Sequence, residues 1–339
     1  MIRRRSLMMF AAAMLLGAVV GLGIAQDDAG QARKGQKGKD EKIEGYTSVS
    51  VNIPAVTLNV VVTDKDGNLI TGLDKSYFKV YEDGQPQELT NFFPDLSPIN
   101  VVLVLESSGV IYGLEYDFWY AVLDFVKNLR PDDYCALITY DIKPRIAVDF
   151  TLDKQKIVRE ANISLYYKGF NESALADVVI FTIDRMREVQ GKKAIIMLST
   201  GLDTFSKKTY DDALKAAATS DTVIYAVSMG QLERTINEPL YSSATRSDLL
   251  MADLRLKSIT KKTGGIAFFP RFTSEYPSVF RNLNMYLRYQ YTMAYTPTNQ
   301  KLDNKNRKIR VEAEADINRD GKPDKLKVSH KESYKAVEK

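Results

Sequence analysis

The stretch Ile99 to Gly109 reads INVVLVLESSG and decides the fold of this chain. Five of the six residues from Val101 to Glu106 are Val or Leu, and a polar Ser-Ser-Gly turn follows at once. A short, continuous β-branched run predicts a strand buried on both faces, as in a parallel sheet covered by helices. Ligands of such sheets bind outside the carboxyl ends of the strands. We therefore expect Glu106, Ser107 and Ser108 to open onto a surface cleft.

Strand-like and helical runs alternate from Ile99 to about Pro270. Glu115 to Leu129 has apolar residues at helical spacing, Arg145 to Thr151 is typical of a short edge strand, and Lys193 to Ser199 is a second buried strand. Alternation of this kind predicts an α/β fold with a doubly wound, mostly parallel sheet.

Two connections within this region carry further expectations. Ser173 is expected to cap a helix that runs to about Val189. The segment from Gly230 to Arg246 is long and polar for a connection, so it is either functional or without regular structure. The next helix is expected from Asp248 to Lys262.

Strand patterns flank the α/β region on both sides. Val56 to Val62 and Tyr77 to Glu82 are strand-like, and Lys308 to Ala315 and Lys325 to Ser329 return to this character near the other end. The early strands are too few to close a core alone, so we expect the late strands to complete a β-sandwich with them. The predicted domains are an N-terminal β unit (46–96), a Rossmann-like α/β domain (97–285) and C-terminal strands (286–339).

The first residues indicate export. Arg3 to Arg5 precede an apolar run from Leu7 to Ile24, and small residues end it at Ala25. This pattern predicts a Sec-type signal peptide over 1–25 and a secreted or periplasmic protein with no membrane contact after cleavage. An uncleaved membrane anchor is the alternative. Residues 26–45 are polar and predict a flexible linker.

Composition and rare residues exclude several classes of protein. The net charge of +4 over 339 residues gives no reason to expect a nucleic-acid partner. Cys135 is the only cysteine, so the chain has no internal disulfide, and it lies in an apolar run typical of a buried position. His330, the only histidine, lies far along the chain from the Glu106 turn, which disfavours a serine hydrolase relay.

Three segments together resemble a von Willebrand factor type A domain. They are the strand that ends in Glu-Ser-Ser-Gly, the segment from Asn171 to Asp177, and the segment from Ile196 to Thr204. The flanking β segments are similar to those of VWFA-related proteins of the acidobacterial type. The resemblance covers the chain from about Val51 to Tyr334.

This resemblance implies a metal-ion-dependent adhesion site in degenerate form. Glu106 stands where the family has Asp, Ser108 matches the first serine, and Val110 replaces the second. Ser173 takes the place of the family's Thr, and Thr200 replaces its second Asp, with Asp203 nearby. The remaining ligands, one carboxylate and two hydroxyls, form a weak cage for magnesium or manganese.

A second candidate metal site lies between the last strands. The sequence from Asp316 to Asp324 reads D-x-N-x-D-G-x-x-D, with Asn318 and Asp320 at the alternate positions. It resembles the first half of a calcium loop, although Lys327 stands where the usual bidentate Glu would be. A plain polar turn explains the same residues.

These observations predict an exported, non-enzymatic binding protein of the adhesion type. Its expected partner is a protein, recognised at the carboxyl ends of the strands through Ser107, Glu172 and Thr200. The alternative is a hydrolytic enzyme that uses the Glu106 and Ser108 cleft.

Overall fold

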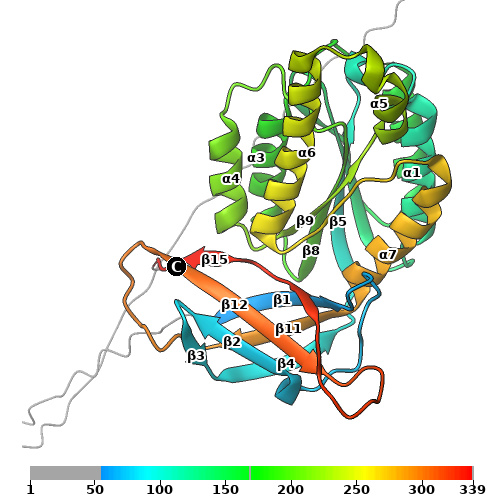
Figure 1. Ribbon diagram of the computed structural model, residues 1–339. Coiled ribbons are helices and arrows are strands. Elements are labelled where there is room, and N and C mark those ends of the chain that lie inside the picture. The colour runs from blue at the N-terminus through cyan, green and yellow to red at the C-terminus, as the bar shows by residue number, and fades with distance from the viewer. Residues whose placement is uncertain (1–54, 168, 338–339) are drawn as a thin grey trace, which may run out of the picture. The chain divides into compact units, whose positions relative to one another are not determined.

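The computed structural model describes residues 55–167 and 169–337, and Figure 1 shows their elements. The expected signal peptide (1–25), the expected linker (26–45) and the start of the N-terminal β unit lie outside these residues. Among the described helices, none combines the length and the apolar character needed to cross a membrane.

A six-stranded sheet forms the centre of the α/β part, in the order β10-β9-β8-β5-β6-β7. Its strands are β5 (Ile99–Glu106), β6 (Tyr134–Tyr140), β7 (Pro144–Thr151), β8 (Lys192–Ser199), β9 (Val223–Ser228) and β10 (Ala267–Phe268). β5 pairs in parallel with both β6 and β8, so that Leu103 lies opposite Leu137 and Ile196. β7 runs antiparallel to β6 at the edge. The doubly wound, mostly parallel sheet is therefore confirmed, with β5 inside it.

Helices cover both faces of this sheet (Figure 1). They are α1 (Glu115–Lys127), α2 (Lys154–Tyr166), α3 (Leu175–Met186), α4 (Tyr210–Thr219), α5 (Gln231–Asn237), α6 (Ser243–Thr263) and α7 (Tyr276–Arg288). Val101 and Leu103 of β5 pack in a core with α1, α2 and α7, whereas Val102 and Val104 pack in a second core with α3, α4 and α6. Both faces of β5 are buried, which explains why its apolar run has no polar interruption.

The segment expected as a long loop, Gly230 to Arg246, is largely helical. It contains α5, the short 3-10 helix η3 (Glu238–Leu240) and the start of α6, which begins before the expected Asp248. Ser242 caps α6, because its hydroxyl accepts a hydrogen bond from the Thr245 amide at 3.1 Å. Polar residues cap and begin this helix, so hydrophobic periodicity indicated it only from Asp248 onward.

Two antiparallel sheets form the expected β-sandwich. Their strands are β1 (Val56–Thr63), β2 (Phe78–Glu82), β3 (Gln85–Gln87), β4 (Leu89–Asp95), β11 (Gln290–Tyr295), β12 (Asn306–Ala315), β13 (Asp324–Lys325), β14 (Lys327–Ser329) and β15 (Ser333–Lys335). One sheet has the order β14-β1-β11-β4, and the other has β13-β12-β2-β3 with β15 beside β12. The β1–β11 and β12–β2 pairs join early and late segments around a shared core that includes Leu58 and Met293.

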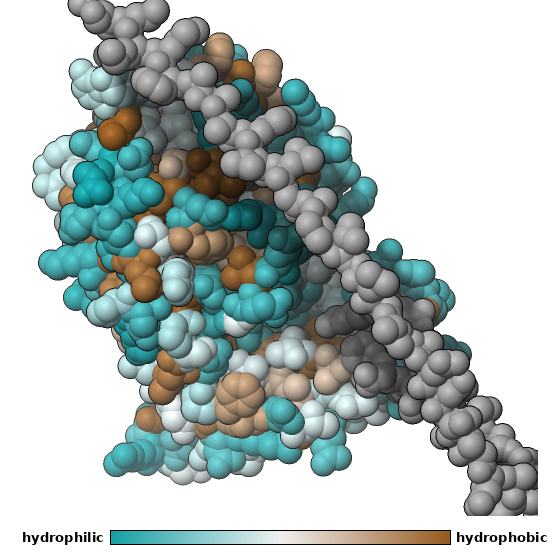
Figure 2. All heavy atoms as spheres, turned by 180° about the vertical axis from the view of Figure 1, so that it is seen from behind, coloured by the Kyte–Doolittle hydropathy of each residue, from teal (hydrophilic) through white to brown (hydrophobic). Residues whose placement is uncertain are grey.

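The surface differs from these cores in composition. On the face seen in Figure 2, hydrophobic side chains are interspersed among hydrophilic ones over both the α/β part and the sandwich. Isolated apolar side chains of this kind are normal on folded proteins. A site must therefore be sought in a specific grouping of side chains.

A buried ion pair at the amino edge of the sheet connects the start of β5, the turn before β6 and the end of α7. Arg288 at the end of α7 forms two bonds to the carboxylate of Asp133, one of them at 2.8 Å. Asp133 also accepts hydrogen bonds from the amides of Ile99 at 3.1 Å and Arg130 at 2.6 Å. Burial raises the pKa of Asp133, but the hydrogen bonds from Arg288 and these two amides have a larger opposite effect. The pKa of Asp133 therefore lies below its usual value. The pair thereby fixes the start of β5 against the helix that leads into β11.

We expect Asp133→Asn to lower the free energy of unfolding by about 3–5 kcal/mol at neutral pH, because it leaves a buried guanidinium without its charge partner. The folded pKa of Asp133 is depressed, so the carboxylate stabilises the protein above its unfolded pKa of about 3.9 and loses this effect as the pH falls through the folded pKa. The deficit of the variant should therefore shrink below about pH 4. Urea unfolding across this pH range measures it, with the exposed neighbour Asp132→Asn as the control. A deficit that does not change with pH would contradict the assignment.

Candidate functional site

Three adjacent strands place polar residues side by side at one edge of the sheet. Glu106 ends β5 and lies opposite Tyr140, the last residue of β6. Ser199 ends β8 on the other side of β5, with Thr200 directly after it. Parallel strands end at the same edge, so these side chains meet there together with Ser108. We call Glu106, Ser108, Tyr140, Ser199 and Thr200 the Glu106 cluster.

The Glu106 carboxylate is fully buried and accepts hydrogen bonds on both oxygens. The Thr200 amide donates to Oε2 at 2.7 Å, and the Thr200 hydroxyl lies 3.0 Å from Oε2 and 3.2 Å from Oε1. The Ser199 and Tyr140 hydroxyls donate to Oε2 at 3.2 Å and 3.3 Å, and the Ser108 hydroxyl donates to Oε1 at 3.1 Å. These donors take the place of water around a buried charge.

Tyr140 remains protonated inside this cluster. Burial and the negative charge of Glu106 raise the pKa of its hydroxyl well above the usual value. The same hydroxyl lies 2.7 Å from the Ser199 hydroxyl, which accepts a hydrogen bond from the Gly201 amide at 2.9 Å. The bonds form a connected network in which each member orients the next. Sequence reasoning missed Tyr140 and Ser199, whose only signal is a polar residue at the end of an apolar strand.

The cluster does not fit a magnesium or manganese ion. A hard divalent cation needs several oxygen ligands with free lone pairs and room for the water molecules that it keeps. Glu106 is the one carboxylate in the cluster, and both of its oxygens already accept hydrogen bonds. Within residues 55–167 and 169–337, no group of three or more His, Cys, Asp or Glu side chains is arranged to hold a metal ion. The cluster is organised as a hydrogen-bonded scaffold.

Asp203 lies outside the cluster and stabilises a helix start instead. Its Oδ2 accepts a hydrogen bond from the Ala176 amide at 3.1 Å, and its Oδ1 accepts one from Ser206 at 3.2 Å. A carboxylate at a helix N-terminus is favoured by the exposed amides there. The expected cap at Ser173 is wrong, because α3 begins after Ala174 and makes no side-chain cap bond. Ser173 is buried, and its hydroxyl has no hydrogen-bond partner among the described residues.

The loop between α2 and α3 closes over the Glu106 cluster. Its Gly169 amide donates to the Ser107 carbonyl at 3.0 Å, and the Phe170 carbonyl accepts from the Gly109 amide at 2.8 Å. The approach is close, because a Cβ at Gly109 would lie 1.8 Å from Asn171 Oδ1. The expectation that the tip of β5 opens onto a surface cleft is therefore corrected.

Burial also limits the residues expected to contact a partner. Ser107 is 4% exposed and donates to the Tyr140 carbonyl at 3.3 Å, and Thr200 is 3% exposed. Glu172 alone among the three is exposed. A partner that meets this face therefore contacts the loops over the cluster rather than the cluster itself.

Exposed aromatic side chains lie on segments that adjoin the buried cluster, and sequence reasoning missed them. Tyr112 is 83% exposed, Tyr166 77% and Tyr167 74%. They come from the loop after β5 and from the end of α2, which lie at the carboxyl edge of the sheet. We call the following set the aromatic rim: Tyr112, Tyr116, Tyr166, Tyr167, Phe170 and Phe205. Aromatic residues beside Gly113 and Gly169, where polar loop residues are usual, were the available signal.

The hydrolase alternative would use Ser108 and Glu106. Their side chains are hydrogen-bonded at 3.1 Å, but both are fully buried under the α2–α3 loop. His330 lies in the other part of the molecule, where its Nε2 accepts a hydrogen bond from the Val311 amide at 3.2 Å and burial lowers its pKa. No described residue therefore brings an imidazole to the serine.

The loop from Asp316 to Asp324 is organised by its own hydrogen bonds. Asp316 accepts from the amides of Asp320 at 3.1 Å and Gly321 at 2.9 Å, and Asn318 accepts from Asp320 at 2.9 Å. Gly321 has a φ of 84°, which permits the sharp turn. Side-chain oxygens that accept from nearby amides are typical of polar turns, so calcium binding stays a prediction.

Comparisons with known proteins show similarity at the level of fold. No family model matches the chain, and no curated protein matches it. An aerotolerance-related membrane protein from Bacteroides fragilis is similar in structure, with 15% identity and a TM-score of 0.43 over 56% of this chain and 98% of that one. The vWF domain of the type V pili tip protein Mfa5 from Porphyromonas gingivalis has 11% identity and a TM-score of 0.40 over 56% and 95%. The PilB minor pilin of Streptococcus sanguinis has 8% identity and a TM-score of 0.40 over 56% and 61%. These likenesses concern the fold alone, and the doubly wound sheet expected for the α/β part is shown by its own strand order.

We expect Glu106→Gln to lower the free energy of unfolding by about 1–3 kcal/mol, because its amide group meets donors where the carboxylate accepts them. The exposed neighbour Glu172→Gln is the control and should change stability little. Thermal unfolding of both variants, with magnesium and with EDTA, measures the effect. If magnesium stabilises the wild type and this effect is lost in Glu106→Gln, the conclusion that the Glu106 cluster does not bind magnesium would be wrong.

The calcium hypothesis predicts a higher melting temperature in millimolar calcium chloride than in EGTA, because a ligand that binds the folded state stabilises it. Asp320→Ala removes a ligand oxygen and should abolish the difference. Asp303→Ala, which lies in another loop, serves as the control variant. Equal midpoints in calcium and EGTA would identify the segment as a plain turn.

Proposed function

We propose that this chain is an exported protein of the adhesion type that binds a protein partner without a metal ion. The observation that carries the proposal is the aromatic rim around the buried Glu106 cluster. Exposed apolar groups that gather on one face of a protein mark an interaction site. Tyrosine and phenylalanine are also enriched in protein interfaces, and tyrosine is among the residue types that most often act as energetic hot spots.

The support beneath the rim favours a rigid binding face. Phe170 follows Gly169, and both are bonded to the turn after β5. The Phe170 amide donates to Asp141, whose carboxylate is also ion-paired with Arg145 at 2.7 Å. The bonds from Arg145 and the Phe170 amide outweigh burial and lower the pKa of Asp141 below its usual value, so it remains charged at neutral pH. Loops held in one conformation lose little entropy when a partner binds.

Contacts between neighbouring aromatic side chains also make the binding face more rigid. The Tyr116 hydroxyl donates to the Tyr120 hydroxyl at 2.6 Å, and the rings of Tyr166 and Tyr167 meet edge to face with centroids 4.8 Å apart. Such pairs restrict side chains that would otherwise move freely at the surface. Glu172 adds a negative charge at the same loop, which gives the face a means of selecting its partner by charge.

We expect the double variant Tyr112→Ala, Phe170→Ala to weaken capture of the partner by about tenfold or more, because aromatic residues at the centre of an interface are energetic hot spots. The matched control is Tyr134→Ala, an exposed tyrosine at the amino end of β6. The mature chain is immobilised, proteins of the cell surface and periplasm are captured, and binding of the identified partner is then titrated with EDTA present.

Two results would contradict the proposal. Unchanged affinity in the double variant would remove the aromatic rim from the interface, and loss of binding in EDTA would restore a metal. The hydrolase alternative predicts instead a substrate turnover that is abolished in Glu106→Gln and unaffected by the rim substitutions.

A further inference from the structure

Half of strand β1 has a free edge. β1 pairs with β11 from Val56 to Val60, but it pairs with β14 only from Val61 to Thr63. β14 ends at Ser329, after which the chain turns toward the end of α6. A Cβ at Gly264 there would lie 2.6 Å from the backbone of the residues that follow β14. The first half of β1 is therefore paired on one side within the described residues.

The hydrogen-bond pattern of β1 shows to which side its unpaired main-chain groups point. Thr63 is bridged to Leu69 on one side and to β14 on the other. The Val62 carbonyl accepts from the Ile70 amide at 2.8 Å, so the main-chain groups of Val62 point to the side of Leu69. That side is also the side of β11, because β14 and β11 flank β1.

Main-chain groups alternate in direction along a strand, and the β1–β11 register has no bulge. Since Val62 points toward β11, the amide and carbonyl groups of Thr57 and Asn59 point toward the side of β14. No hydrogen bond reaches these groups from another described residue. Unpaired groups of this kind are a template for an added strand.

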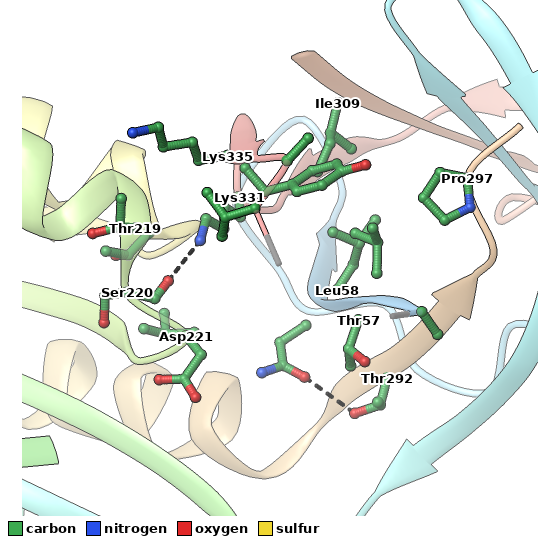
Figure 3. Close-up of a pocket in the computed structure, with 18 of the residues that line it drawn as sticks. Thr57, Leu58, Thr219, Ser220, Asp221, Thr292, Pro297, Ile309, Lys331 and Lys335 are labelled. Atoms are coloured by element: carbon green, nitrogen blue, oxygen red, sulfur yellow. Dashed lines mark hydrogen bonds between the residues drawn. The ribbon is translucent and has the colours of Figure 1, made fainter. Parts of the chain in front are cut away.

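This free edge borders a cavity of about 820 Å³ between the α/β part and the sandwich. Figure 3 shows Thr57, Leu58 and Thr292 on one side of it and the segment from Thr219 to Asp221 on the other. Ile309 and Tyr334 add an apolar wall on the sandwich side. A volume of this size accommodates a peptide segment of a few residues.

The charges that line the cavity are predominantly positive. Five lysines line it, against two aspartates. These lysines are Lys192, Lys193, Lys301, Lys331 and Lys335. Lys193 is ion-paired with Asp221 at 3.0 Å, whereas the ammonium groups of Lys192 and Lys331 donate to main-chain carbonyls, of Asp95 at 2.5 Å and of Ser220 at 2.7 Å. The cavity therefore favours a ligand that carries negative charge.

We propose that this cavity binds an extended acidic peptide of another protein, which adds as a strand to the free edge of β1. Its main chain pairs with Thr57 and Asn59. Its alternate side chains lie on opposite faces, the apolar ones toward Ile309 and Tyr334 and the acidic ones toward the lysines. This mode of recognition takes affinity from main-chain hydrogen bonds and specificity from alternate side chains. The site lies at the amino ends of β8 and β9, away from the aromatic rim.

The test uses the mature chain and a fluorescein-labelled peptide, acetyl-Val-Glu-Val-Glu-Val-amide, with binding followed by fluorescence anisotropy. Thr57→Pro removes one amide donor from the free edge and leaves the bonds to β11 intact, so it should weaken binding about two- to tenfold. Thr57→Ala keeps the amide and is the matched control, with affinity equal to that of the wild type. Peptides methylated on alternate main-chain nitrogens should bind more weakly when the methyl groups meet β1.

Separate variants test the role of the cavity lysines and the independence of the cavity from the aromatic rim. The double variant Lys301→Glu, Lys335→Glu should bind the Val-Glu peptide more weakly than the wild type does, and should bind a Val-Lys peptide of the same length more tightly. The rim variant Tyr112→Ala, Phe170→Ala should bind the Val-Glu peptide like the wild type, so failure here is distinguishable from failure of the proposed function. Equal affinity of Thr57→Pro and Thr57→Ala, or no binding of the peptide at all, would overturn the proposal.

Discussion

The cost of burying one carboxylate controls the architecture of the loop face. Glu106 ends a strand that is covered on both faces, so its charge has no access to water. The free energy of that burial is offset only if donors converge on both oxygens. Thr200 and Tyr140 supply such donors from the strands on either side, which requires the loops after β8 and β6 to adopt one arrangement.

The consequences extend from the carboxylate to the surface. With the turn after β5 held in place, its carbonyl at Ser107 and its amide at Gly109 become fixed partners for the α2–α3 loop. That loop carries Phe170 and follows Tyr166 and Tyr167, so the aromatic rim is supported from beneath. The buried acidic residue Glu106 thus organises the overlying loops through hydrogen bonds.

The two ends of the parallel sheet have different surroundings. At the carboxyl end, the polar side chains of the Glu106 cluster bond to one another and aromatic side chains are exposed. At the amino end, the sandwich meets the sheet through contacts such as that of Lys192 at the start of β8, which donates to the carbonyl of Asp95 in β4. Within residues 55–167 and 169–337, the sandwich does not cover this end completely, because β14 is short and leaves the first half of β1 without a second neighbour. The positive cavity lies there.

Much of the fold follows from local patterns. The unbroken apolar run of β5 indicates burial on both faces, and the alternation of strands and helices indicates a doubly wound sheet. Strand patterns occur both before and after the α/β region, and neither set is large enough to close a core alone, which predicts that the two sets form one sandwich. The helices between Gly230 and Arg246 were not predictable in this way, because Ser242 and its polar neighbours give a capping signal without an apolar period.

Most of the elements, their order and the acidic residue at the end of the central strand follow from the sequence alone, because periodicity and turn chemistry act over a few neighbouring residues. The enclosure of Glu106, the bonds of Asp203 to a helix start and, among the described residues, the lack of a second neighbour for the first half of β1 became evident only in the folded molecule. Each of these depends on which distant donors or strands reach a group. Such contacts arise from packing between segments far apart in the chain, which local patterns do not encode.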